Sequence, residues 1–125
     1  MRIAKPFDPI EVGEIDNFAF DFTADVGTAT MVSTSWMCAL APFQTAFDPA
    51  PQSRVLAVSA QAAIQMRSPV DGSLQTRVGA FSIGTIGEMP ASANGATYVL
   101  EATANLSDGR VLKLNATVLC MQTGP

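Results

Sequence analysis

The sequence predicts an all-β domain, and two stretches of it show this most clearly. Phe18, Phe20 and Phe22 alternate with small or polar residues, which is the period of two expected of a strand with one buried face. Near the other end, two segments of alternating apolar residues flank the turn-forming pair Asp108-Gly109. Short strands separated by turn signals, with no helical period between them, indicate an immunoglobulin-like antiparallel β-sandwich.

The 125 residues are enough for one domain with two short ends. Residues 1–16 contain Pro6 and Pro9 and no sustained period, so we expect an extended N-terminal arm that adds little to the core. Residues 17–121 form the predicted sandwich, and residues 122–125 form a C-terminal tail. The strands that we predict cover residues 17–25, 30–40, 55–66, 74–85, 97–106 and 110–121.

The segment from Val55 to Met66 is alanine-rich, and its composition is compatible with a helix. Its even positions are all apolar, whereas its odd positions include Ser59 and Gln61, so a period of two fits better than a helical period. The turn-forming residues 68–73 suit a hairpin. We therefore favour a strand, with a helix as the alternative.

The length of the turn between the last two predicted strands determines whether their apolar faces lie on the same side of the sheet. A two-residue turn would place Leu112 opposite Asn105, which brings an apolar residue against a polar one. A three-residue loop over 107–109, with Gly109 left-handed in a G1 bulge, places Leu112 opposite Ala104 instead. The two apolar faces then coincide, so the sequence predicts the three-residue turn.

Composition restricts the classes of function. The net charge is −4, and the seven basic residues are scattered, which argues against a nucleic-acid groove. No apolar run has the length of a membrane helix and the first residues lack the pattern of a secretory signal, so we expect a soluble intracellular product without a membrane partner. Only 14% of residues are charged, and this predicts a surface that is largely covered by neighbours.

Side chains suited to catalysis are scarce. The sequence contains no histidine, which removes Ser-His-Asp and Cys-His catalysis and most zinc sites. The N-terminal acidic residues lack the spacing of a calcium loop. We expect no enzyme activity, no cofactor and no metal. Cys38 and Cys120 are expected to be reduced and buried, with a disulfide between strands as the alternative, and Trp36 is expected in the core rather than on a ligand-binding face.

Apolar residues in the arm and in one loop suggest a partner-binding role. The arm has too many of them for a purely solvating tail, so we predict that it docks on another subunit. The loop over 41–53 is bounded by prolines and contains two phenylalanines that a partner can reach. The predicted partner-binding residues are Ile3, Pro6, Phe7, Ile10, Val12, Phe43 and Phe47.

Several stretches also carry a family resemblance. They are Ile3-Ala4-Lys5-Pro6-Phe7-Asp8-Pro9, Phe18-Ala19-Phe20-Asp21-Phe22-Thr23, Val32-Ser33-Thr34-Ser35-Trp36 and a terminal hairpin from Tyr98 to Leu114. Together they resemble a family of small tailed-bacteriophage structural proteins, the phage fibre–tail adaptor proteins. The resemblance covers residues 3–119, and the segment from Val55 to Gln75 departs from the family pattern.

This resemblance implies an immunoglobulin-like module of the virion, repeated as a ring in the neck or tail region. Such a module links the tail or portal complex to fibres. Its implied partners are other virion proteins and copies of itself, and its implied location is the virion, assembled in the host cytoplasm. The alternative is a host-surface or carbohydrate-binding sandwich, which would display exposed aromatic residues on its loops.

Overall fold

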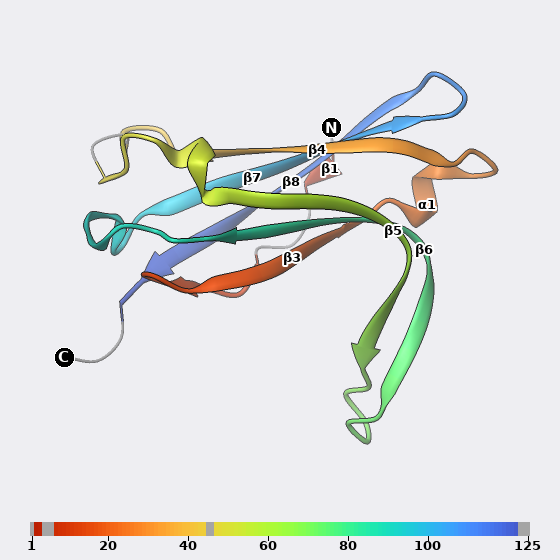
Figure 1. The fold of residues 1–125 in the computed structure, drawn as a ribbon, viewed down its shortest axis with the longest axis horizontal. Coiled ribbons are helices and arrows are strands. Elements are labelled where there is room, and N and C mark those ends of the chain that lie inside the picture. Colours follow the sequence, from red (N-terminus) through yellow and green to blue (C-terminus); the bar gives the residue numbers. More distant parts are fainter. Residues whose placement is uncertain (1, 4–6, 45–46, 123–125) are drawn as a thin grey trace.

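A computed structural model describes residues 2–3, 7–44 and 47–122, with backbone alone at residues 2, 3 and 66. Two β-sheets face each other (Figure 1). One sheet contains β1 (Arg2–Ile3), β2 (Ile10–Glu11), β4 (Met31–Leu40), β7 (Thr97–Leu106) and β8 (Val111–Met121). The other contains β3 (Ile15–Asp21), β5 (Val55–Arg67) and β6 (Leu74–Gly87). Short helical turns occur at α1 (Thr23–Val26), η2 (Pro51–Arg54) and η3 (Ala91–Ala93).

The strand order is that of the immunoglobulin fold. In one sheet β8 neighbours β7 and β7 neighbours β4, and in the other sheet the order is β3, β6, β5. If β3 to β8 are read as strands B to G, these are the G-F-C and B-E-D orders of that fold. The predicted all-β sandwich is therefore confirmed. The short strands β1 and β2 pair with β8 in parallel, so the first sheet is mixed rather than purely antiparallel.

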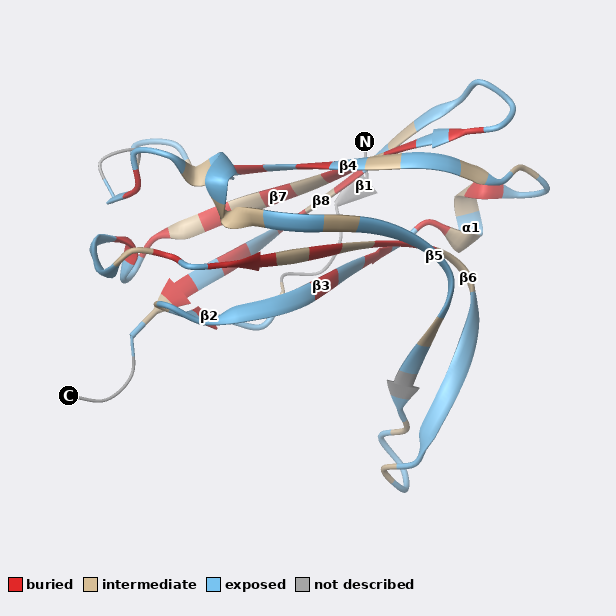
Figure 2. Ribbon diagram, in the orientation of Figure 1, coloured by how far each residue is buried: buried red, intermediate tan, exposed pale blue. Residues whose placement is uncertain are grey.

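The core lies between the two sheets. Phe18, Phe20 and Phe22 are all buried, which confirms the predicted stripe. Trp36 is also buried, its ring lies 5.0 Å from that of Phe20, and its indole nitrogen donates a hydrogen bond to Ser82 Oγ at 2.7 Å. Figure 2 shows the buried positions along β7, β8 and the part of β6 that lies within the sandwich. The core role of the tryptophan is thus confirmed.

Both pattern-based predictions for the later strands are confirmed. Residues 55–67 form β5, so the strand alternative holds over the helix. The β7–β8 register pairs Ala104 with Leu112, and Leu106 N donates to Arg110 O at 2.9 Å. Gly109 has φ 89°, as the bulged three-residue turn requires.

The first predicted strand ends earlier than expected. The strand stops at Asp21, and residues 23–26 form α1 instead of continuing to Asp25. The Asp21 carboxylate accepts the backbone N–H of Thr23 at 2.9 Å, and this local bond turns the chain. Val26 N then donates to Phe22 O at 3.1 Å and closes the turn.

The expectation that residues 1–16 add little to the core is wrong. β3 already begins at Ile15, and β1 and β2 extend the sheet along the edge of β8. Ile10 has no exposed surface at all and belongs to the main core cluster. The free edge of β8 offers backbone partners, and the gap between the sheets accepts the apolar side chains, so this segment folds with its own domain.

The two cysteines are free and buried. Cys38 lies on β4 and Cys120 on β8, and β7 separates these strands. Two inter-strand steps of roughly 4.8 Å exceed the Cα separation that a disulfide spans. Burial, and then the charge of Asp48, raises the pKa of the Cys38 thiol to about 12.

Candidate functional site

The N-terminal members of the predicted partner-binding set serve their own sandwich. The ring of Phe7 lies 4.9 Å from that of Phe18, Ile10 is fully buried, and Val12 packs against the core while its N–H donates to Met121 O at 3.0 Å. Ile10 is therefore covered by its own sheets, whereas Phe7 and Val12 are partly buried, and the docking of this segment on another subunit stays a prediction. Ile3 lies in β1 and pairs with Asn115, and Pro6 lies outside the described residues.

The two remaining members lie on a loop at one end of the sandwich. We call residues 41–54, of which 45 and 46 are not described, the Phe43 loop. Phe43 is fully exposed and has φ 70°, and Phe47 is 38% exposed. The structure thus leaves both side chains exposed, and their binding to a partner stays a prediction.

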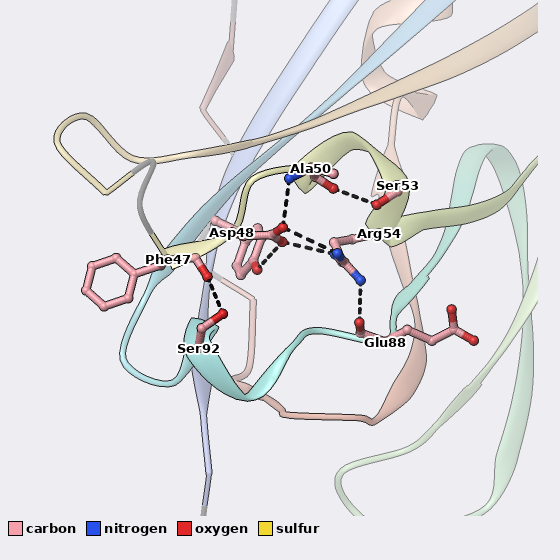
Figure 3. Close-up of polar contacts among 8 residues, drawn as sticks. Phe47, Asp48, Ala50, Ser53, Arg54, Glu88 and Ser92 are labelled. Atoms are coloured by element: carbon pink, nitrogen blue, oxygen red, sulfur yellow. Dashed lines mark hydrogen bonds and ion pairs between the residues drawn. The ribbon is translucent and has the colours of Figure 1, made fainter.

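A buried carboxylate fixes this loop to the sandwich (Figure 3). Asp48 is 1% exposed and accepts hydrogen bonds from Arg54 Nε at 3.0 Å, Tyr98 OH at 2.6 Å and Ala50 N at 3.0 Å. Arg54 donates in turn to the backbone oxygen of Glu88. The loop, the start of β7 and the end of β6 therefore share one hydrogen-bonded cluster.

The electrostatics of this cluster favour the charged carboxylate. Burial alone would raise the pKa of Asp48, but the hydrogen bonds from Tyr98, Ala50 and Arg54 outweigh burial and lower that pKa. Burial and the neighbouring carboxylate raise the pKa of Tyr98. Since these donors satisfy the carboxylate away from solvent, the cluster positions the loop. Among the residues that the structure describes, no group of His, Cys, Asp or Glu could hold a metal ion.

A second feature is the far half of the β5–β6 hairpin, residues 62–78, which we call the projecting hairpin. It turns away from the sandwich (Figure 1), and Figure 2 shows it mostly exposed. β3 ends at Asp21 opposite Phe81, so beyond that point β6 pairs only with β5 among the described strands. Val70, Leu74 and Val78 are 92%, 62% and 76% exposed. A two-stranded hairpin in this position gains little from burial.

The projecting hairpin leaves the sandwich at a β-bulge. Between the pairs Gln61–Phe81 and Ala63–Val78, β5 advances by two residues and β6 by three, which leaves the extra residue at Gly79 or Ala80. Such a bulge bends its strand. We call this bend the elbow.

Contacts with α1 and with the end of β3 hold the elbow in one direction. Thr23 Oγ1 accepts the N–H of Ala80 at 3.0 Å, and a Cβ at Gly79 would come within 2.1 Å of that oxygen, so only glycine fits there. Arg77 forms an ion pair with Asp21 at 2.7 Å, and its guanidinium lies 5.8 Å from the centre of the Phe81 ring. The hairpin is therefore oriented by its own chain.

A pocket of about 450 Å³, which we call the elbow pocket, lies beside the elbow, where β5 and β6 separate from the start of β4. Its walls come from α1 and the turn that follows it on one side, and from the elbow on the other. The apolar part of the lining consists of Val26, Ala29, Met31, Ala60, Ala62 and Ala80. Several lining residues, Ala60 and Ala62 among them, are exposed, so the pocket opens to solvent.

Sequence reasoning predicted the two strands of the hairpin and its turn, but it missed their projection from the sandwich, the elbow and the pocket. One signal was available, because the segment from Val55 to Gln75 departs from the resemblance that the sequence suggests. A second was the run from Leu74 to Val78, which has three polar residues between its two apolar ends and so lacks a sustained apolar face. Neither signal shows that the strands continue beyond the sandwich.

Neither a membrane-spanning helix nor a similar known protein is found for the described part of the chain. No helix within the described ranges has the length and apolarity needed to cross a membrane. No family model, curated protein or solved structure matches the chain.

Proposed function

We propose that the chain is a structural subunit of a bacteriophage virion, an adaptor in the neck or tail region that links the tail or portal complex to fibres. The projecting hairpin is the observation that supports this most. It contributes little to its own core, yet a bulge, the Thr23 hydroxyl and the Arg77–Asp21 pair fix its direction. A rigid, exposed and partly apolar element is suited to binding a neighbouring subunit, because little conformational entropy remains to be lost.

Composition and family resemblance support the rest of the proposal. Only 14% of the residues are charged, as expected of a protein whose surface is covered in an assembly. The resemblance of the opening residues 3–9 and of the segments 18–23 and 32–36 to fibre–tail adaptors supplies the bacteriophage part. Partners are then other virion proteins and further copies of this chain.

A complementation experiment tests the proposal. A phage whose own gene for this chain is inactivated is supplied with the native chain or with a variant in which Gln65–Thr76 is replaced by Asn-Gly. This short turn keeps Arg77 and the elbow. We expect the native chain to restore fibre-bearing particles and to be present in them by mass spectrometry, while the shortened variant folds but is not incorporated. Val111→Ser, which alters an exposed apolar residue on β8, serves as the control and should be incorporated.

Two results would overturn the proposal. One is the assembly of fibre-bearing, infective particles without the chain. The other is the absence of the native chain from purified particles that assemble in its presence.

A second candidate function, binding of host-surface carbohydrate, is favoured by one observation. Phe43 is fully exposed on a fixed loop, and aromatic side chains can stack on sugar rings. A glycan array probed with the native chain and with Phe43→Ala tests it. Glycan binding that disappears in the variant would support this function over the adaptor role.

A further inference from the structure

We infer that copies of this chain associate head to tail, with Phe43 of one copy seated in the elbow pocket of the next. This inference deepens the proposed function and rests on it for the setting in which copies meet. Its residue-level content comes from four observations: a displayed aromatic side chain, an open apolar pocket, their separation within one copy, and the distribution of charge.

Phe43 is held in a conformation that makes no use of its side chain within its own copy. It occupies a tight turn in which Gln44 N donates to Ala41 O, and it has φ 70°, which a phenylalanine rarely adopts. The turn is tied to β7 because Thr97 N donates to Gln44 Oε1 at 2.7 Å and Ala41 N donates to Thr97 O at 2.9 Å. An exposed aromatic on a strained and anchored turn is a preorganised contact residue.

The elbow pocket has the chemistry and the size for such a ring. Alanine methyl groups at 60, 62 and 80 form one wall, and Val26 and Met31 lie across from them in the lining. A buried aromatic side chain removes about 150–250 Å² of surface from water. The volume of about 450 Å³ accommodates one phenylalanine ring together with the neighbouring atoms of its turn.

The ring and the pocket cannot meet within one copy. The Phe43 loop follows the end of β4, whereas α1 and the elbow lie at its beginning, at opposite ends of the molecule in Figure 1. The 10 residues of β4 span about 30 Å. A contact between them must therefore join two copies, and because it uses two different surfaces it leaves one of each free for further copies.

Charge favours the same orientation. The projecting hairpin contains Arg67, Arg77 and Asp71, a sum of +1, so the rest of the chain, with the total at −4, carries −5. Exposed Glu14 and Glu88 lie at the end that bears the Phe43 loop, where Glu88 N donates to Glu14 O. Head-to-tail packing brings this hairpin, in which Arg77 is paired with Asp21 and Arg67 is exposed, towards the acidic end of the next copy, whereas packing of two acidic ends is repulsive.

The test uses two variants that each remove one side of the contact. Phe43→Ala removes the ring, and Ala62→Phe fills the pocket from its exposed wall. In sedimentation velocity over a wide concentration range, the native chain and the control Val111→Ser should form oligomers that grow with concentration. Each variant alone should associate at least tenfold more weakly. A one-to-one mixture should form heterodimers and nothing larger, because the pocket of the first variant accepts the ring of the second.

Cross-linking gives a readout that does not depend on filling the pocket. Phe43→Cys mixed with Ala62→Cys should yield a disulfide-linked dimer under mild oxidation, and Val111→Cys mixed with Ala62→Cys should not. Circular dichroism of each variant shows whether it has folded, and Ala60→Leu replaces Ala62→Phe if the latter does not fold.

The inference is overturned if the native chain stays monomeric at millimolar concentration, or if the mixed variants neither pair nor cross-link. A chain that is monomeric in solution but is incorporated into particles would leave the adaptor role standing and remove only the head-to-tail contact. A chain that associates as described but is absent from particles would support the head-to-tail contact and overturn the adaptor role.

Discussion

The N-terminal segment and the projecting hairpin both lie at the periphery of the sandwich, and both contain a few apolar residues. The fold buries an apolar side chain of the first segment and exposes those of the second. Ile10 is fully buried because β2 pairs with β8 at the margin of the core. Val78 is 76% exposed because it lies beyond the end of β3, with no third strand beside it among the described strands. Burial thus depends on whether a sheet faces the segment. The comparison distinguishes residues that stabilise this domain from residues that a neighbouring subunit can contact.

Deleting residues 1–12 should have the largest effect. It removes Ile10, whose truncation alone costs roughly 2–5 kcal/mol, and the Phe7 ring, and it exposes the edge of β8. The total approaches the roughly 5–15 kcal/mol by which domains are stable, so we expect loss of the cooperative thermal transition in circular dichroism. An unchanged melting temperature would show that the segment is a separate arm after all.

Asp48→Asn should have the next largest effect, because the Phe43 loop resembles the N-terminal segment in being held by the core. Removing one partner of a buried ion pair costs about 3–5 kcal/mol, which urea denaturation at pH 7 measures. Tyr98→Phe is the milder control, at about 1–3 kcal/mol for a lost buried hydrogen bond. A loss below about 1 kcal/mol in Asp48→Asn would contradict the anchoring role.

The same carboxylate predicts a pH dependence. The folded state lowers the pKa of Asp48 below its unfolded value, which lies near 3.9. Its contribution is therefore fully present above that value and is lost as the pH falls through the lower, folded pKa. The free energy of unfolding of the native chain should fall on acidification below about pH 4, and less so in Asp48→Asn. Equal acid sensitivity of the two proteins would contradict this.

The reactivity of the two buried thiols tests whether the N-terminal segment protects the core beside β8. Ile10 of β2 is the register partner of Cys120, whereas Cys38 lies on β4. Burial raises both pKa values, and for Cys38 a pKa of about 12 against 9.0 lowers the thiolate fraction by about 1,000-fold. Both thiols should react slowly with a thiol reagent at pH 7.5. In Ile10→Ala, Cys120 should react faster while Cys38 stays slow. Equal acceleration of both would indicate global unfolding rather than local release of β2.

Single substitutions in the projecting hairpin should have the smallest effect. Leu74→Ser and Val78→Ser alter side chains that are mostly exposed, so the free energy of unfolding should change by no more than about 0.5 kcal/mol. Chemical denaturation measures it. A loss of 2 kcal/mol or more would mean that this face packs against the chain's own sandwich.

The parts of the fold that sequence reasoning predicted are those in which local pattern and burial agree. The alternation at Phe18, Phe20 and Phe22 predicts a buried face, and the matched faces around Gly109 predict a strand register. Both are found in the structure. These signals are local, and they concern residues that the opposite sheet covers.

The features that sequence reasoning missed depend on where neighbouring strands end. Ile10 and Val78 look alike in sequence, since each is an apolar residue in a run without a sustained period. Only the end of β3 at Asp21 and the free edge of β8 decide that one is buried and the other exposed. The candidate site likewise combines Phe43, which sequence reasoning selected, with a pocket built from α1 and the elbow, which no local pattern marks.

The most direct test of the central claim is the stability of the chain with a shortened hairpin. Replacing Gln65–Thr76 by Asn-Gly removes the tip and most of the exposed strands but keeps Arg77, Gly79 and the elbow. If the projecting hairpin serves assembly rather than folding, urea denaturation should give a free energy of unfolding within about 1 kcal/mol of the native value, with cooperativity retained. A loss of several kcal/mol would contradict the account and make the hairpin part of the domain's own fold.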